Sequence, residues 1–204
     1  MIGIDEAGRG PLFGRVYTSA VILPEEGFDL TCLKDSKKFT SKKKITEVSN
    51  YIKEKALYYS ISYSDENDID TLNILGATIK SMKESAKHVI TQYIEKNDIH
   101  NIKLYVDGTN FKPLFYNNNT YSLYIPYECV VKGDSIHKCI SAASILAKVE
   151  RDNYIENLCN KYPELDERYD LKKNKGYGTK KHIEGIKQYG YSEFHRKSFK
   201  LKSI

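Results

Sequence analysis

The chain has 204 residues, of which 40% are hydrophobic and 29% are charged, and it contains no tryptophan. This length and composition predict a single globular domain over residues 1–204. The longest apolar runs are far shorter than the ~20 residues that a membrane helix needs. Only four residues precede Asp5, too few for a signal peptide, so we expect a cytoplasmic protein without a membrane partner.

The formal net charge of +5 is unevenly distributed. Residues 171–204 carry ten Lys or Arg and two Glu, a net charge of +8, so the other 170 residues sum to −3. A basic end on an acidic body indicates a polyanionic partner, although a solvated lysine-rich tail has the same composition. The four cysteines form no C-x-x-C pair and the histidines are scattered, which excludes a zinc-site spacing.

The chain starts with a short apolar run that ends in two adjacent carboxylates, Asp5 and Glu6, before the turn Gly8-Arg9-Gly10. This pattern predicts a buried strand closed by a turn. Carboxylates at a strand end can hold a hard cation such as Mg²⁺, and glycines let backbone N–H groups approach a phosphate or sugar. Two solvated acids in an exposed turn are the alternative. Neighbouring strand residues point to opposite faces, so the two acids share a metal only if the strand bends or ends between them.

After this turn, the sequence predicts strands that alternate with helices. β-branched and apolar residues over 16–23 predict a second strand paired with the first. Thr40 or Ser41 is placed to cap a helix that ends near Lys55. Weak alternation predicts a third strand over 57–63, and helical spacing of apolar residues predicts a helix over 72–95.

Residues 102–107 repeat the layout of the first strand, because an apolar run ends in Asp107 and a glycine. After a loop over 108–121, residues 122–131 predict a fifth strand interrupted by Pro126. Asp134 or Ser135 is placed to cap a long helix that ends before Pro163, and a short helix follows to about residue 189. These elements predict a mixed α/β sheet.

The strand ends suggest a carboxylate cluster. If the first and fourth strands are parallel neighbours, Asp5 and Asp107 emerge at the edge where open α/β sheets bind ligands. Asp134, at a helix start, can reach the same edge. With Glu6, these carboxylates would repel one another and raise their pKa values. Divalent ions remove that repulsion, and two metal ions ~3.5–4 Å apart are a standard arrangement for in-line phosphodiester cleavage.

Asp152 is the alternative to Asp134 in this cluster. The two residues are 18 positions apart, so a helix places them on one face but roughly 27 Å apart. Both therefore cannot serve one metal site. We favour Asp134, which starts the helix, and expect Asp152 to pair with Arg151 or Lys148 or to support the fold.

Residues 5–11 (DEAGRGP) resemble the signature of the ribonuclease HII family, the type 2 ribonucleases H. Further segments resemble that family over nearly the whole chain: residues 35–38, 105–108, 132–135, 141–152, 176–179 and 195–199. The resemblance implies a ribonuclease H-like mixed five-stranded sheet flanked by helices, with residues 163–204 as a C-terminal helical substrate-binding extension. It also implies a monomeric endonuclease that cuts the RNA strand of RNA–DNA hybrids and DNA duplexes containing ribonucleotides, leaving 3′-hydroxyl and 5′-phosphate ends.

The resemblance further assigns roles to single residues. Asp5, Glu6, Asp107 and Asp134 become the catalytic set that binds two Mg²⁺ or Mn²⁺ ions. The Gly8-Arg9-Gly10 turn contacts the 2′-hydroxyl, the group that distinguishes RNA from DNA, and Tyr177 packs against the neighbouring sugar at the RNA–DNA junction. Further expected substrate contacts are Ser36, Lys37, Lys132 and Lys180.

Phe13 and Arg15 depart from the family pattern, which usually has a small residue and a proline there. We hypothesise that Arg15 adds a phosphate contact. Two other functions remain open: a non-catalytic binder of RNA–DNA hybrids, and another metal-dependent nuclease on the same fold. The complete carboxylate set favours an enzyme over a binder. The Gly8-Arg9-Gly10 turn and Tyr177 favour ribonucleotide recognition over a nuclease that acts on DNA junctions.

Overall fold

The computed structural model describes residues 1–33, 36, 39–117 and 122–200. A five-stranded sheet forms its centre, in the order β3-β2-β1-β4-β7. The strands β1, β4 and β7 run parallel, whereas β2 is antiparallel to both β1 and β3. The predicted mixed sheet, with the first and fourth strands as parallel neighbours, is therefore confirmed. The strand bounds are β1 Ile2–Ala7, β2 Val16–Ile22, β3 Tyr58–Ser64, β4 Leu104–Asp107 and β7 Tyr127–Val130.

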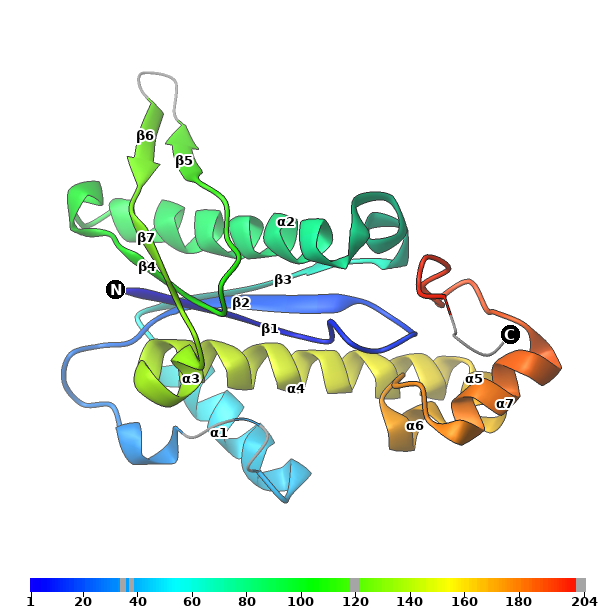
Figure 1. Ribbon diagram of the computed structural model, residues 1–204. Coiled ribbons are helices and arrows are strands. Elements are labelled where there is room, and N and C mark those ends of the chain that lie inside the picture. The colour runs from blue at the N-terminus through cyan, green and yellow to red at the C-terminus, as the bar shows by residue number, and fades with distance from the viewer. Residues whose placement is uncertain (34–35, 37–38, 118–121, 201–204) are drawn as a thin grey trace.

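Helices cover both faces of the sheet (Figure 1). The long helix α2 (Glu66–Ile94) lies on one face, and α4 (Lys138–Lys161) with α1 (Lys42–Lys55) lies on the other. Ala142 and Ala143 of α4 are fully buried, beside larger buried residues such as Ile145 and Leu146. A Cβ atom on Gly3 would lie 2.2 Å from the carbonyl carbon of Cys139. This close approach places α4 directly under β1.

The segment predicted as a loop and one interrupted strand is a hairpin followed by a separate strand. β5 (Leu114–Asn117) pairs antiparallel with β6 (Ser122–Ile125), outside the central sheet. Pro126 separates β6 from β7, since a proline cannot donate a ladder hydrogen bond. Its carbonyl accepts from Leu104 N at 2.9 Å, so β7 pairs with β4 while β6 turns away.

Two helix predictions need correction. The helix predicted over 72–95 begins earlier, at Glu66, and is interrupted at Asn73 (φ 58°), whose side chain caps the helix that restarts there. The helix predicted to start at Asp134 or Ser135 is two helices, α3 (Gly133–Ile136) and α4. Asp134 therefore lies inside α3 and does not cap α4. Ser41 does cap α1, as predicted.

The C-terminal part is helical over α5 (Pro163–Tyr169), α6 (Leu171–Asn174) and α7 (Lys180–Tyr189). Phe13, from the turn between β1 and β2, is fully buried against this part, with its ring 4.9 Å from that of His195. Short 3₁₀ helices span Leu30–Cys32 and Ile99–Asn101. Among the described helices, none combines the length and apolar character needed to cross a membrane.

Candidate active site

The predicted carboxylates meet at one edge of the sheet. Because β1 and β4 pair with Ile4 opposite Val106, Asp5 and Asp107 follow at the same level of neighbouring strands. Asp107 Oδ1 accepts a hydrogen bond of 2.7 Å from Gly133 N, which ties the end of β4 to α3, the helix that carries Asp134. Strand pairing and one hydrogen bond from a backbone N–H to the Asp107 carboxylate thus bring distant parts of the sequence together.

These acids line a cleft of about 350 Å³ with most of the other predicted site residues. Lys180 does not line this cleft; it is exposed at the start of α7, 3.8 Å from Glu184. Lys37 lies outside the described residues. The predicted residues that line the cleft are Asp5, Glu6, Gly8, Arg9, Gly10, Ser36, Asp107, Lys132, Asp134 and Tyr177, and those that were not predicted are Ala7, Ser144, Lys148 and Arg151.

Asp5 is the most deeply placed of these acids, with 5% of its surface exposed. Burial raises its pKa well above the ordinary value, and the charges of Glu6 and Asp107 raise it further. A hydrogen bond of 2.6 Å from Glu6 N, together with the Ser144 hydroxyl, acts in the opposite direction. The carboxylates therefore repel one another in the absence of a cation.

The donors in the cleft fit a hard divalent cation, since carboxylate oxygens are the ligands that Mg²⁺ and Mn²⁺ prefer. Burial and the neighbouring charges of Glu6 and Asp107 raise the pKa of Asp5, and a cation in the cleft would offset these effects. Within the described parts of the chain, however, no three His, Cys, Asp or Glu side chains are arranged so that they could hold a metal ion. The cleft therefore supplies suitable donor atoms but not a preformed metal site.

The turn after β1 forms a second wall of the cleft. Gly8 has φ 96°, and a Cβ atom there would lie 2.1 Å from Arg151 Nε, so a side chain is excluded by both conformation and space. A Cβ atom on Gly10 would lie 3.3 Å from the ring of Tyr177, which is 51% exposed. The turn thus presents bare backbone beside an exposed aromatic ring.

Arg196 binds the backbone of this turn, a role that the sequence did not reveal. Its guanidinium is fully buried and donates to four backbone carbonyls of the turn. These are the carbonyls of Gly8 at 2.6 Å, Pro11 at 2.7 Å, Gly14 at 2.7 Å and Arg9 at 3.0 Å. Residue 196 lies in a segment that resembles the family, yet a single arginine in a basic tail gives no local signal of burial.

A buried histidine pair supports Tyr177. His182 Nδ1 lies 2.9 Å from the Tyr177 carbonyl, and its Nε2 lies 3.0 Å from His195 Nε2. Burial lowers the pKa of His182, and burial together with His182 lowers the pKa of His195 to about 3. Both rings are therefore neutral and serve to position the backbone.

Of two further basic residues, Lys148 lines the cleft and Arg15 does not. Asp152 pairs with Lys148 at 2.6 Å, which confirms one of the predicted pairings, and Lys148 lines the cleft. The guanidinium of Arg15 lies outside the cleft lining, stacked 4.0 Å from the Tyr63 ring and 4.7 Å from the Tyr154 ring. Its proposed phosphate contact stays a prediction.

The fold matches solved structures over most of the chain. The complex of PCNA with RNase HII from Archaeoglobus fulgidus aligns with a TM-score of 0.68 at 22% identity, covering 96% of this chain and 91% of that one. Bst-RNase HIII in complex with Mn²⁺ aligns with a TM-score of 0.63 at 16% identity, covering 92% and 69%. The fold and the acidic cleft at its sheet edge define a protein of the ribonuclease H-like class.

Sequence comparison narrows this class to one family. A family model described as Ribonuclease HII matches residues 2–202. Ribonuclease HII of Christiangramia forsetii is 42% identical over 199 residues, covering 98% of this chain and 89% of that protein, and the Trichodesmium erythraeum enzyme is 44% identical over 200 residues, covering 97% and 85%. The chain belongs to the ribonuclease HII family, a family of ribonucleases.

Proposed function

We propose that this chain hydrolyses the RNA strand of RNA–DNA hybrids and cuts on the 5′ side of single ribonucleotides embedded in duplex DNA, leaving 3′-hydroxyl and 5′-phosphate ends. One observation carries the proposal: the four carboxylates, the bare Gly8–Gly10 backbone and the exposed Tyr177 ring line the same cleft. A nuclease needs only the first feature. The other two suit recognition of a sugar that bears a 2′-hydroxyl.

Asp5, Glu6, Asp107 and Asp134 would hold two divalent ions, Mg²⁺ or Mn²⁺. When bound, such ions activate water for attack on phosphorus and stabilise the charge of the leaving oxygen. The presence of Mn²⁺ in the Bst-RNase HIII structure supports this choice of ions. In the free protein, burial and then the charges of Glu6 and Asp107 raise the pKa of Asp5, and a bound cation would favour its ionised form.

The turn and Tyr177 would select the substrate. Backbone groups of Gly8, Arg9 and Gly10 contact the 2′-hydroxyl, because no side chain at Gly8 or Gly10 blocks the approach. Tyr177 packs on the adjacent sugar at the RNA–DNA junction. Lys132, at the rim of the cleft, attracts the phosphate backbone. Residues 163–204 form, in this account, a substrate-binding extension of one domain, and we propose a cytoplasmic monomer.

The test uses three labelled substrates: a DNA duplex with one ribonucleotide, the same duplex without it, and a long RNA–DNA hybrid. Each is incubated with Mg²⁺ or Mn²⁺ and with either wild-type protein or Asp5→Asn. We expect wild type to cut the first and third substrates and Asp5→Asn to cut none. Cutting of the all-DNA duplex would instead indicate a broader nuclease. Binding without cutting would indicate a hybrid-binding protein.

A further inference from the structure

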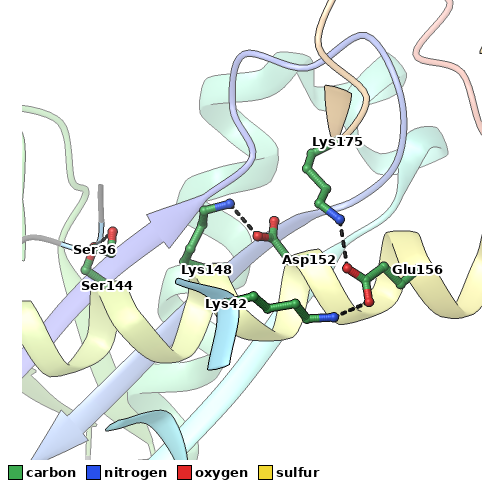
Figure 2. A network of polar contacts seen from close by, with 7 residues as sticks. All are labelled: Ser36, Lys42, Ser144, Lys148, Asp152, Glu156 and Lys175. Atoms are coloured by element: carbon green, nitrogen blue, oxygen red, sulfur yellow. Dashed lines mark hydrogen bonds and ion pairs between the residues drawn. The ribbon is translucent and has the colours of Figure 1, made fainter. Parts of the chain in front are cut away.

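Four polar side chains lead away from the cleft along one face of α4. Ser144, Lys148, Asp152 and Glu156 follow at four-residue intervals, which places them on one ridge of the helix (Figure 2). Ser144 and Lys148 line the cleft. At about 1.5 Å per residue, Glu156 lies roughly 18 Å beyond Ser144 along the helix axis. The ridge therefore connects the cleft with a separate surface position.

At that position, two lysines from different elements meet one carboxylate. Glu156 Oε1 accepts from Lys175 Nζ at 2.8 Å, and Oε2 accepts from Lys42 Nζ. Figure 2 shows the Glu156 carboxylate between these two lysines, next to the Lys148–Asp152 pair. Lys42 begins α1, and Lys175 lies two residues before Tyr177. The three side chains have a net charge of +1 and remain partly exposed, at 58% for Lys42, 22% for Lys175 and 27% for Glu156.

We propose that Lys42 and Lys175 form a phosphodiester subsite for the bound duplex, and that Glu156 occupies this subsite while the protein is free. A phosphodiester, like a carboxylate, presents two oxygens side by side that share one negative charge. Two ammonium groups that converge on the Glu156 oxygens can therefore converge on a phosphate. The excess positive charge favours the phosphate.

The subsite rests on the proposed function, because it assumes a duplex in the cleft. For a duplex that lies along α4, the 18 Å offset corresponds, at about 3.4 Å per base pair, to at most roughly five base pairs beyond the reacting nucleotide. Contacts at this distance supply affinity and register but no chemistry. The alternative is a purely structural clamp that joins α1, α4 and the loop after α6.

The experiment measures Kd for a duplex with one ribonucleotide, without divalent cations, between 50 and 200 mM salt. In Glu156→Gln the subsite has a charge of +2, so we expect tighter binding and a slope of log K against log salt that is steeper by about 0.9, or about a 3.5-fold larger change over this range. Lys42→Ala and Lys175→Ala should each weaken binding and make the slope shallower by a similar amount. Glu128→Gln is the matched control, since it frees Lys103 (2.8 Å) by the same change of charge.

A second experiment varies the length of the duplex on each side of the ribonucleotide. Progressive trimming of one side of the duplex, from about five base pairs downward, should abolish the effects of all three subsite variants, while trimming the other side should leave them. Equal slopes in wild type and all three variants would overturn the subsite. So would a Glu128→Gln effect as large as that of Glu156→Gln, or an effect independent of duplex length. Failure of wild-type protein to bind any ribonucleotide-containing duplex would overturn the proposed function itself.

Discussion

Arg196 Nη2 donates a hydrogen bond of 2.6 Å to the carbonyl of Gly8, although 188 positions separate the two residues. The same guanidinium reaches three more carbonyls of the turn, which points the turn's carbonyls inward and leaves its opposite side for the cleft. The C-terminal tail is itself anchored, because Asp70 accepts from Lys197 N at 3.0 Å and Ser198 N at 2.8 Å. The conformation of the proposed recognition turn thus depends on the far end of the chain.

Arg196→Lys should therefore destabilise the fold and impair ribonucleotide recognition together. A lysine cannot reach four carbonyls at once, and each buried acceptor left without a donor costs about 1–3 kcal/mol. We expect the free energy of unfolding to fall by about 2–4 kcal/mol in urea titrations. Discrimination between ribonucleotide-containing and all-DNA duplex in binding should fall as well. Unchanged discrimination in the folded variant would contradict the positioning role, and exposed Arg168→Lys is the control.

Asp5→Asn should abolish cleavage and yet stabilise the metal-free protein. The raised pKa of Asp5 means that the folded state binds its proton more tightly than the unfolded state, whose value is near 3.8. Stability is therefore lost as pH rises above about 4, and the neutral asparagine avoids that loss. Relative to wild type, we expect the free energy of unfolding of Asp5→Asn to be higher by about 0.5–2 kcal/mol at pH 8. Below pH 4 we expect no difference between the two proteins. Denaturation with a chelator present measures it, and a loss of stability at pH 8 would contradict the account.

The buried histidine pair should lower the stability of the protein at acidic pH, which is the opposite of the effect expected from Asp5. Since burial lowers the pKa of His195 from 6.5 to about 3, the unfolded state binds more protons in this window, and stability falls as pH decreases from 6.5 towards 3. Between pH 7.5 and 5.0 we expect a loss of about 2 kcal/mol from this group. His195→Asn should remove that part of the pH dependence, whereas exposed His100→Asn should retain it. Parallel curves for wild type and His195→Asn would count against the assignment.

Tyr177→Ala should separate recognition from stability. Its ring is half exposed, so the free energy of unfolding should change by about 0.5 kcal/mol or less. Loss of an aromatic contact with a nucleotide, worth roughly 1–3 kcal/mol, should slow cleavage at a single ribonucleotide by about 10- to 100-fold. Tyr177→Phe should retain most of the rate. Tyr189→Ala is matched in exposure, at 50%, and should have no effect on cleavage; equal rates for Tyr177→Ala and wild type would remove the proposed contact.

The carboxylate cleft was predictable because strand ends are visible in a sequence. An apolar run that stops at Asp5, and another that stops at Asp107, define strand ends, and parallel pairing brings them together. The hairpin β5–β6 was not predictable, because its strands have four residues each and only one residue of each is buried. The break between α3 and α4 at His137 also has no proline or glycine to mark it.

The supporting residues were hidden for a different reason. Arg196 and His195 are polar residues of a basic tail, and local sequence assigns such residues to the surface. Their burial depends on partners more than 180 positions away, such as Phe13 and the carbonyl of Gly14. Lys148 and Arg151 lie in a segment that resembles the ribonuclease HII family. Helical spacing alone, however, does not show that a side chain reaches the cleft.

In the proposed reaction, the carboxylate cleft directs water to the phosphate on the 5′ side of a ribonucleotide. Its most direct test is the position and end-group chemistry of the products from a duplex with one ribonucleotide. We expect one cut on the 5′ side, with a 3′-hydroxyl and a 5′-phosphate, and no product from Asp5→Asn. A cut on the 3′ side that leaves a 2′,3′-cyclic phosphate would contradict it, because the 2′-hydroxyl, not water, would then be the nucleophile.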